Sequence, residues 1–151
     1  MKNYSKICVE ILGKAHDLIL YTDTEEFVFN KDGNYFEDDE LEKMIIPDEE
    51  IVVMNKLIDS GYLNSENFKN EVFDYMNECR ENMGMENLEL KDLWSDLEIR
   101  KIVTRKEEDS NEIKVFLLGE IEETDPEHGI SIGFLNNEVM GMGGEMDYEA
   151  M

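Results

Sequence analysis

The sequence has few of the residues on which many reactive sites depend. Its 151 residues include two cysteines and two histidines. Cys8 and Cys79 form no C-x-x-C pair, so a secreted disulfide scaffold is not expected. His16 and His128 show no metal-ligand spacing such as H-E-x-x-H, and no G-x-S-x-G segment marks a nucleophile. We therefore predict no catalytic residue, no metal and no cofactor.

Basic residues are also scarce, which excludes further classes of function. Lysine and arginine number 14 against 38 aspartates and glutamates, a formal net charge of −24. Without a basic patch that releases phosphate counterions, direct binding to nucleic acid or to an anionic membrane is not expected. So much like charge costs stability through self-repulsion, and a basic partner is one reason to keep it. A solvated face that aids solubility is the alternative.

Long apolar runs are missing too. The segment "ICV" near the N-terminus is interrupted by Glu10, so it is too short for the core of a signal peptide. No other run approaches the length of a membrane span. We expect a cytoplasmic protein. Its length and its hydrophobic fraction of 41% suit one core, so we predict a single acidic domain over residues 1–151.

The first third of the chain has the pattern of strands. Apolar residues at every second position favour a strand over 7–11 that turns into a second strand near 17–21. A short helix over 3–20 is the competing interpretation. Further along, Asp32-Gly33 stands between aromatic runs and indicates a hairpin with a type I′ turn.

Two amphipathic helices follow. Pro47 and the three acids after it are typical of a helix start, and this helix is predicted to end at Gly61. The next helix is predicted from an N-cap at Ser65 to a stop at Gly84. Its apolar residues recur at a period near 3.6 and are Phe68, Val72, Tyr75, Met76, Cys79 and Met83. A shorter amphipathic segment lies over 90–97.

The last third changes to the period of strands. The predicted strands are 98–105, 113–121, 130–135 and 138–142, and Asn136-Asn137 is predicted to turn the last two into a hairpin. Because the connections are short, we expect these strands to be antiparallel neighbours. The fold class is therefore predicted to be α+β, with central helices packed on a C-terminal antiparallel sheet and with N-terminal hairpin strands.

The C-terminal third resembles a known family. The segments "LWSDLEIRKIVT", "IKVFLLGEIEETDPEHGISIGF" and "GMGGEMDY" are similar to a bacterial family of unknown function whose members carry W-D-P-E-H-G between two strands. Residues 125–129 match this motif, and Thr124 stands where the family has tryptophan. The resemblance covers about residues 50–148. Such families are similar in size and setting to bacterial immunity proteins, so the resemblance implies a protein that neutralises a toxin from a neighbouring cell.

The segment "DPEHG" contains the more conspicuous of the two histidines. Asp125-Pro126 is a preferred opening of a type I turn, and Gly129 supplies a residue for positive φ at the entry to the next strand. Each residue of the segment thus has a structural role. We interpret His128 as part of a turn, with contact to a partner as the alternative.

Acidic residues gather in two places, which would form an extended negative surface if they share one face. One is 37–50, and the other comprises the polar loops that carry Glu107, Glu108, Asp109, Glu122, Glu123 and Asp125. Aromatic residues that flank the first cluster are candidate anchors for a partner. The predicted partner-binding residues are Tyr35, Phe36, Glu37, Asp38, Asp39, Glu40, Glu42, Asp48, Glu49, Glu50, Tyr62, Glu122, Glu123, Asp125 and His128.

These observations favour binding over catalysis. The leading hypothesis is a cytosolic immunity protein that occludes a basic toxin domain through an acidic surface, with carboxylates in place of substrate phosphates. A nucleic-acid mimic that inhibits a DNA-binding enzyme is the second hypothesis. An enzyme of unknown reaction is the third, and it would require His128 to lie in a deep pocket.

Overall fold

A six-stranded mixed sheet organises the fold. The computed structural model describes residues 6–37 and 44–151. The strands lie in chain order across the sheet and are β1 (Ile7–Ile11), β2 (Lys14–Thr22), β3 (Leu97–Lys106), β4 (Ile113–Ile121), β5 (Ile130–Leu135) and β6 (Glu138–Gly143). The helices are α1 (Asp48–Asp59), α2 (Glu66–Asn82) and α3 (Leu90–Asp96), with the 3-10 helices η1 (Glu25–Phe27), η3 (Tyr62–Asn64) and η4 (Glu145–Ala150). The predicted α+β class is confirmed.

The N-terminal hairpin belongs to the same sheet as the later strands. β1 and β2 are antiparallel, and Leu12 and Gly13 turn the chain with φ of 52° and 79°. The competing helix is therefore wrong for residues 6–20. β2 pairs with β3 in parallel, with Leu20 opposite Ile102. Thus the sheet is not a C-terminal unit as predicted, because the helical segment forms a crossover long enough for parallel pairing.

The helix boundaries follow the local signals. α1 begins after Pro47, and Gly61 has a φ of 79° just beyond its end. In α2 the Ser65 hydroxyl accepts a hydrogen bond from the Phe68 amide at 3.2 Å, which satisfies an amide that the first turn leaves free. Gly84 lies beyond the other end with a φ of 73°.

The buried face of α2 is turned from the one predicted. Phe68, Val72 and Met76 are buried as expected, but Met83 is 46% exposed. Phe73 is only 3% exposed, although it lay outside the predicted stripe. Because successive helical residues are about 100° apart, positions 72 and 73 are both buried only when the centre of the buried face lies between them.

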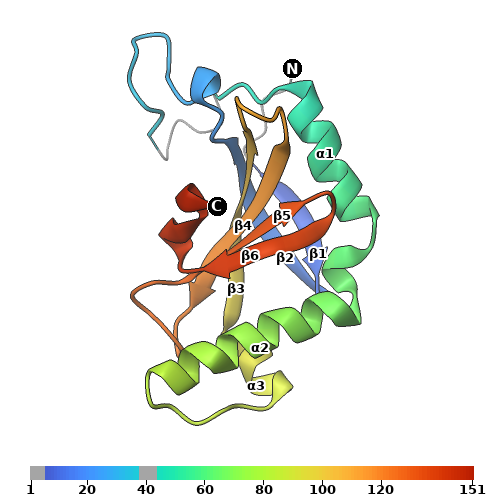
Figure 1. The fold of residues 1–151 in the computed structure, drawn as a ribbon, viewed down its shortest axis with the longest axis vertical. Coiled ribbons are helices and arrows are strands. Elements are labelled where there is room, and N and C mark those ends of the chain that lie inside the picture. The colour runs from blue at the N-terminus through green and yellow to red at the C-terminus, as the bar shows by residue number, and fades with distance from the viewer. Residues whose placement is uncertain (1–5, 38–43) are drawn as a thin grey trace.

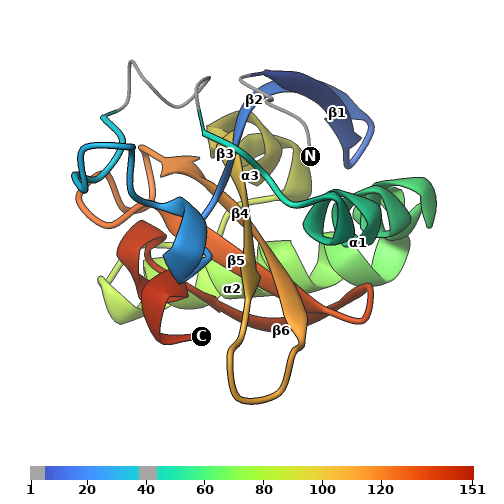
Figure 2. The ribbon, with the colours of Figure 1, turned by 90° about the horizontal axis from the view of Figure 1, so that it is seen from above.

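Helices cover one face of the sheet, and η4 covers the other. Figure 1 shows α1 along one side and α2 below it, while the C-terminal η4 lies on the opposite side of the strands. The view from above in Figure 2 shows the same separation of α1 from η4. The central strands therefore have protein on both faces.

The side chains of β4 show these two faces directly. Val115 and Leu117 join the main core, which also contains buried residues of β1–β3, β5, α1, α2 and α3. Phe116 and Leu118 point the other way and pack with Tyr148 of η4. Alternation along a strand sends neighbours to opposite faces, so the run "VFLL" is apolar throughout because both faces are covered.

The two predicted turns differ in outcome. Asn136 and Asn137 have φ of 52° and 65° and join β5 to β6, which confirms the hairpin. At Asp32-Gly33 the chain does turn back, but only a single bridge forms, between Phe29 and Tyr35. Gly33 alone has positive φ there. The Asn30 side chain accepts hydrogen bonds from two later amides of the loop and so holds a wider turn than type I′.

Candidate functional site

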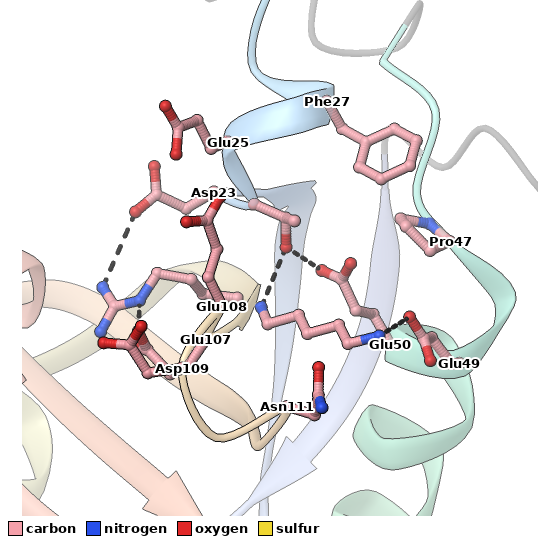
Figure 3. Close-up of a pocket in the computed structure, with 13 residues that line it drawn as sticks. Asp23, Glu25, Phe27, Pro47, Glu49, Glu50, Glu107, Glu108, Asp109 and Asn111 are labelled. Carbon is pink, nitrogen blue, oxygen red and sulfur yellow. Dashed lines mark hydrogen bonds and ion pairs between the residues drawn. The ribbon is translucent and has the colours of Figure 1, made fainter.

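A pocket opens where η1, the start of α1 and the β3–β4 turn meet. It has a volume of about 590 Å³. Figure 3 shows its residues, which come from these three separate segments of the chain. The lining comprises seven acids, two bases and four other residues: Asp23, Glu25, Glu49, Glu50, Glu107, Glu108 and Asp109; Arg105 and Lys106; Thr24, Phe27, Pro47 and Asn111. Its formal charge is therefore −5.

The first turn of α1 supplies carboxylates in two different environments. Asp48, Glu49 and Glu50 all lie in this turn, where the positive end of the helix dipole stabilises negative charge. The helix directs neighbouring side chains apart. Glu49 is exposed at the pocket edge, whereas Glu50 is 0% exposed. Of these two neighbouring acids, Glu49 therefore faces solvent and Glu50 faces the interior.

Glu50 is held by hydroxyl groups from two strands and a loop. Its Oε1 accepts hydrogen bonds from the hydroxyls of Thr22 at 2.6 Å, Thr104 at 2.8 Å and Thr24 at 3.0 Å. Thr24 in turn accepts the backbone N–H of Lys106 at 2.9 Å. Among residues 6–37 and 44–151, the other oxygen, Oε2, has no hydrogen-bond partner although it is buried. Oε1 thus links α1 to β2 and β3 through hydrogen bonds, whereas Oε2 has no donor among the described residues.

Arg105 forms the opposite wall of the pocket. Its Nε donates to Glu107 Oε1 at 2.8 Å, and its two terminal nitrogens donate to the carbonyl oxygens of Tyr148 and Met151, both at 3.1 Å. The guanidinium also lies 4.7 Å from the centre of the Phe116 ring. These contacts fix Arg105 as a structural residue that joins the pocket wall to η4.

Lys106, the other base of the pocket, bonds to the edge of α1. Its Nζ lies 2.9 Å from Glu49 Oε1, and both side chains are partly exposed. An ammonium group of this chain thus already occupies one side of the acidic pocket.

The acids of the pocket differ in how readily they ionise. Burial raises the pKa of Asp23, and this effect outweighs the opposing attraction of Arg105. Burial also acts to raise the pKa of Glu107, but hydrogen bonds from Arg105 and Lys114 outweigh it and bring that pKa below its ordinary value. Glu107 is therefore matched by cations of the chain itself, whereas Asp23 is imperfectly compensated.

Several predicted binding residues lie at or near this pocket. Glu49 and Glu50 line it, and Asp48 is in the same helical turn. Tyr35 and Glu37 are exposed and Phe36 is half-buried in the loop that follows η1. Four further predicted residues lie outside the described residues, namely Asp38, Asp39, Glu40 and Glu42.

The remaining predicted residues lie elsewhere. Tyr62 follows the far end of α1, about 18 Å along the helix from Pro47 at 1.5 Å per residue. Its ring packs against Phe68 and Phe134, and its hydroxyl donates to Glu71. Tyr62 thus contributes to the edge of the core and does not flank the acidic pocket.

The second acidic cluster is divided by β4. The loop with Glu107, Glu108 and Asp109 precedes this strand and reaches the pocket, whereas Glu122, Glu123 and Asp125 follow it. Nine strand residues separate the two ends by about 30 Å. In Figure 1 the loop after β4 lies near the end of α2, away from the start of α1. The condition for an extended negative surface, that the two clusters share one face, is therefore not met.

The "DPEHG" segment forms a turn stabilised by its first residue. Asp125 Oδ1 accepts the backbone N–H of His128 at 3.2 Å, and the same oxygen lies 2.9 Å from His128 Nδ1. Gly129 has a φ of 62°, and a Cβ there would lie 2.6 Å from the Gly119 carbonyl oxygen. His128 is exposed, so the deep pocket that the enzyme hypothesis requires is not present around it.

Thr124, where the resembling family has tryptophan, is buried. It is 1% exposed, its backbone N–H donates to Asp96, and its hydroxyl accepts a hydrogen bond from Arg80. Hydrogen bonds to Asp96 and Arg80 therefore satisfy the buried Thr124, whereas a tryptophan at this position would pack through its aromatic ring.

Sequence patterns did not identify the residues that complete the pocket. Thr22, Thr24 and Thr104 appear as ordinary strand or loop residues, and Asp23 and Arg105 belong to no motif. Their proximity depends on the parallel pairing of β2 with β3, which places Thr22 opposite Thr104. The one usable signal was the acidic helix start after Pro47.

Comparison of the chain with protein-family models, curated proteins and solved structures gives no match. Within the described part of the chain, no three or more His, Cys, Asp or Glu residues are arranged to hold a metal ion. No helix in that part is long and apolar enough to cross a membrane. The resemblance to the family with the "DPEHG" motif stays a prediction.

Proposed function

We propose that this protein binds a basic protein and blocks it, in the manner of a bacterial immunity protein bound to its toxin. The observation that carries this proposal is the acidic pocket beside the start of α1, in a chain of net charge −24. A concave site with a formal charge of −5 attracts cationic side chains and repels acidic proteins.

Exposed aromatic side chains near the pocket supply the apolar contacts that such binding requires. The rings of Phe29 and Tyr35 lie with their centres 4.7 Å apart and their planes tilted by 37°, and they are 42% and 68% exposed. Both belong to the loop that continues from η1, which lines the pocket. Since a few central aromatic residues supply most of the affinity in typical interfaces, this pair is the proposed anchor.

Occlusion is the proposed mechanism. The carboxylates at the start of α1 and in the β3–β4 turn would occupy the cationic cleft in which the toxin holds the phosphates of its substrate. Charge would speed the encounter, and the aromatic pair would slow dissociation. No chemical reaction of the immunity protein is needed.

Neutralising exposed acids around the pocket tests the proposal. In the triple variant Glu25→Gln, Glu37→Gln and Asp109→Asn, we expect association with the basic partner to slow about tenfold at low salt, because electrostatic steering is weakened. The partner is the basic protein captured by the immobilised chain from cells of the source, then purified. Stopped-flow fluorescence at several salt concentrations measures the rate and its salt dependence, which should flatten.

A matched triple variant at the other end of β4 is the control. Glu122→Gln, Glu123→Gln and Glu127→Gln remove the same charge from exposed positions and should change association much less. Equal rates for the two triple variants would contradict a site at the pocket. Binding of many unrelated basic proteins, with duplex DNA as a competitor, would favour the nucleic-acid mimic instead.

A further inference from the structure

The Glu50 carboxylate places a buried oxygen without a hydrogen-bond partner in the wall of the pocket, among the residues that the structure describes. Its side chain is 0% exposed, and all three threonine hydroxyls that reach it converge on Oε1. Among the described residues nothing donates to Oε2, which is shielded from water. Leaving a buried acceptor without a donor costs about 1–3 kcal/mol, and more for a charged group. An unsatisfied buried group of this kind calls for an explanation, and a bound cation that supplies the missing donor is one.

We propose that Glu50 Oε2 is the end point of a site for one cationic side chain, an arginine or lysine of the basic partner. The inference rests on the proposed function and assigns that binding to a particular group. The cation would enter the pocket between the start of α1 and the β3–β4 turn and donate a hydrogen bond to Oε2. Threonine hydroxyls on Oε1 hold the carboxylate in place for this contact.

The composition of the pocket favours a cation over other ligands. Seven acids line it against two bases, and Arg105 is already engaged by Glu107 and two carbonyl oxygens. Lys106 contributes an ammonium group that donates a hydrogen bond to Glu49 Oε1 at 2.9 Å, so the pocket already binds this chemical group at one side. An anionic or phosphate ligand would meet repulsion from the remaining acids.

Apolar residues beside Glu50 suit the aliphatic part of such a side chain. Phe27 and Pro47 both line the pocket, and Figure 3 shows them on the same side as Glu50. Arginine and lysine bury their methylene groups against apolar surface while the charged end seeks a polar partner. Because Oε2 is shielded, the cation reaches it only if a neighbouring side chain turns aside. Phe27 is half-buried on a single turn of 3-10 helix and lines the pocket, so it is the side chain that we expect to turn aside.

Titration of the free protein with small cations tests the site without any partner. The probes are N-acetyl-arginine methylamide for a guanidinium, butylamine for an ammonium, and N-butylacetamide as the neutral control. We expect saturable changes in the amide NMR signals of Thr22, Thr24 and Lys106 with the two cations and none with the neutral probe. The cation that binds with the lower Kd identifies whether the partner inserts an arginine or a lysine.

Glu50→Gln removes the charge and retains an acceptor for the threonine hydroxyls. We expect it to weaken cation binding at least tenfold, whereas Glu122→Gln, an equal charge change at an exposed site beyond β4, leaves it unchanged. If Glu50→Gln fails to fold, the exposed pair Glu25→Gln and Asp109→Asn replaces it, with Glu122→Gln and Glu123→Gln as its control. The pocket pair should weaken binding severalfold and the control pair should not.

Two results would overturn the site. One is the absence of saturable shifts at the pocket, and the other is equal weakening by pocket and control variants. If either occurs while the triple variant at the pocket still slows association with a basic partner, the proposed function stands without the Glu50 site. If the small cations bind as expected but no basic partner exists, the cation site stands and the proposed function fails.

Discussion

The two histidines of this chain occupy opposite environments. His16 is 4% exposed on β2, and its Nε2 has no hydrogen-bond partner among the described residues. Burial, together with the nearby charge of Lys14, lowers the pKa of His16 below 6.5. His128 is exposed, and its hydrogen bond with Asp125 raises its pKa above 6.5. One residue type therefore gives two pH responses of opposite sign.

We expect an NMR titration of the imidazole signals to show His128 titrating above 6.5 and His16 below it. As the pH drops below 6.5, the unfolded chain protonates His16 before the folded protein does. The free energy of unfolding therefore falls between pH 6.5 and the folded pKa of His16. The His128 contribution is present below 6.5 and is lost as the pH rises through its folded pKa. Asp125→Asn should return His128 toward 6.5 without moving His16. An unchanged His128 would show that Asp125 is not the cause.

Adjacent residues also show where sequence patterns reach their limit. The run at the start of α1 correctly predicted a helix start, because acids and proline act locally there. The same run did not reveal that Glu49 faces solvent and Glu50 faces the interior. That distinction depends on which side of the helix meets β2 and β3, which is a tertiary property.

At the scale of elements, one glycine allows β3 and β4 to pair across an irregularity. The register of the two strands shifts between Ile99 and Lys101, and Gly119 lies opposite Ile99. A Cβ on Gly119 would overlap the Glu98 carbonyl oxygen and lie 2.9 Å from the Ile99 Cα. The obstacles are backbone atoms of a paired strand, so they cannot move aside cheaply.

We expect Gly119→Ala to lower the free energy of unfolding by roughly 1–3 kcal/mol, the usual cost of overpacking. Urea denaturation followed by circular dichroism measures it. Gly141→Ala in β6 is the matched control, because the three atoms nearest to a Cβ there belong to the flexible Met151 side chain, at 3.6–3.9 Å. Gly141→Ala should change stability by no more than about 0.5 kcal/mol. Similar losses for both would show that the close approach at Gly119 is not decisive.

Secondary structure was more predictable than its assembly. The β5–β6 hairpin followed from Asn136-Asn137, and α2 followed from Ser65 and Gly84, because each signal acts within a few residues. The pairing of β2 with β3 left no trace in the sequence, since it joins segments on either side of three helices. The Asp32-Gly33 turn was predicted in place but not in type, because the Asn30 side chain competes for the same amides.

At the scale of the whole molecule, the negative charge that would attract a basic partner also destabilises the folded state. The net charge is −24, and among the described residues acids lie at both ends of the sheet, in the pocket and in the loop after β4. Composition predicted this charge, but only the fold shows that the acids divide into separate regions. Self-repulsion of this size opposes the compact state at low ionic strength.

We therefore expect sodium chloride to raise the melting temperature at neutral pH by about 3 °C or more, because salt screens repulsion between exposed carboxylates. Differential scanning calorimetry at low and moderate salt measures the change. Near the isoelectric point of about 4.2 the net charge is close to zero, so the same addition of salt should have little effect. Equal salt effects at both pH values would point to a cause other than net charge.

The parallel pair β2–β3 has a consequence for how the chain folds. Leu20 meets Ile102 across a separation of 82 residues, and the hydroxyls that hold Glu50 depend on the same pairing. Closing so long a loop is slow, because its entropy is lost before any contact is gained. The β1–β2 hairpin is complete early in synthesis, yet one edge of β2 stays open until β3 has left the ribosome. During that interval the open edge is where a chaperone or a second chain would bind.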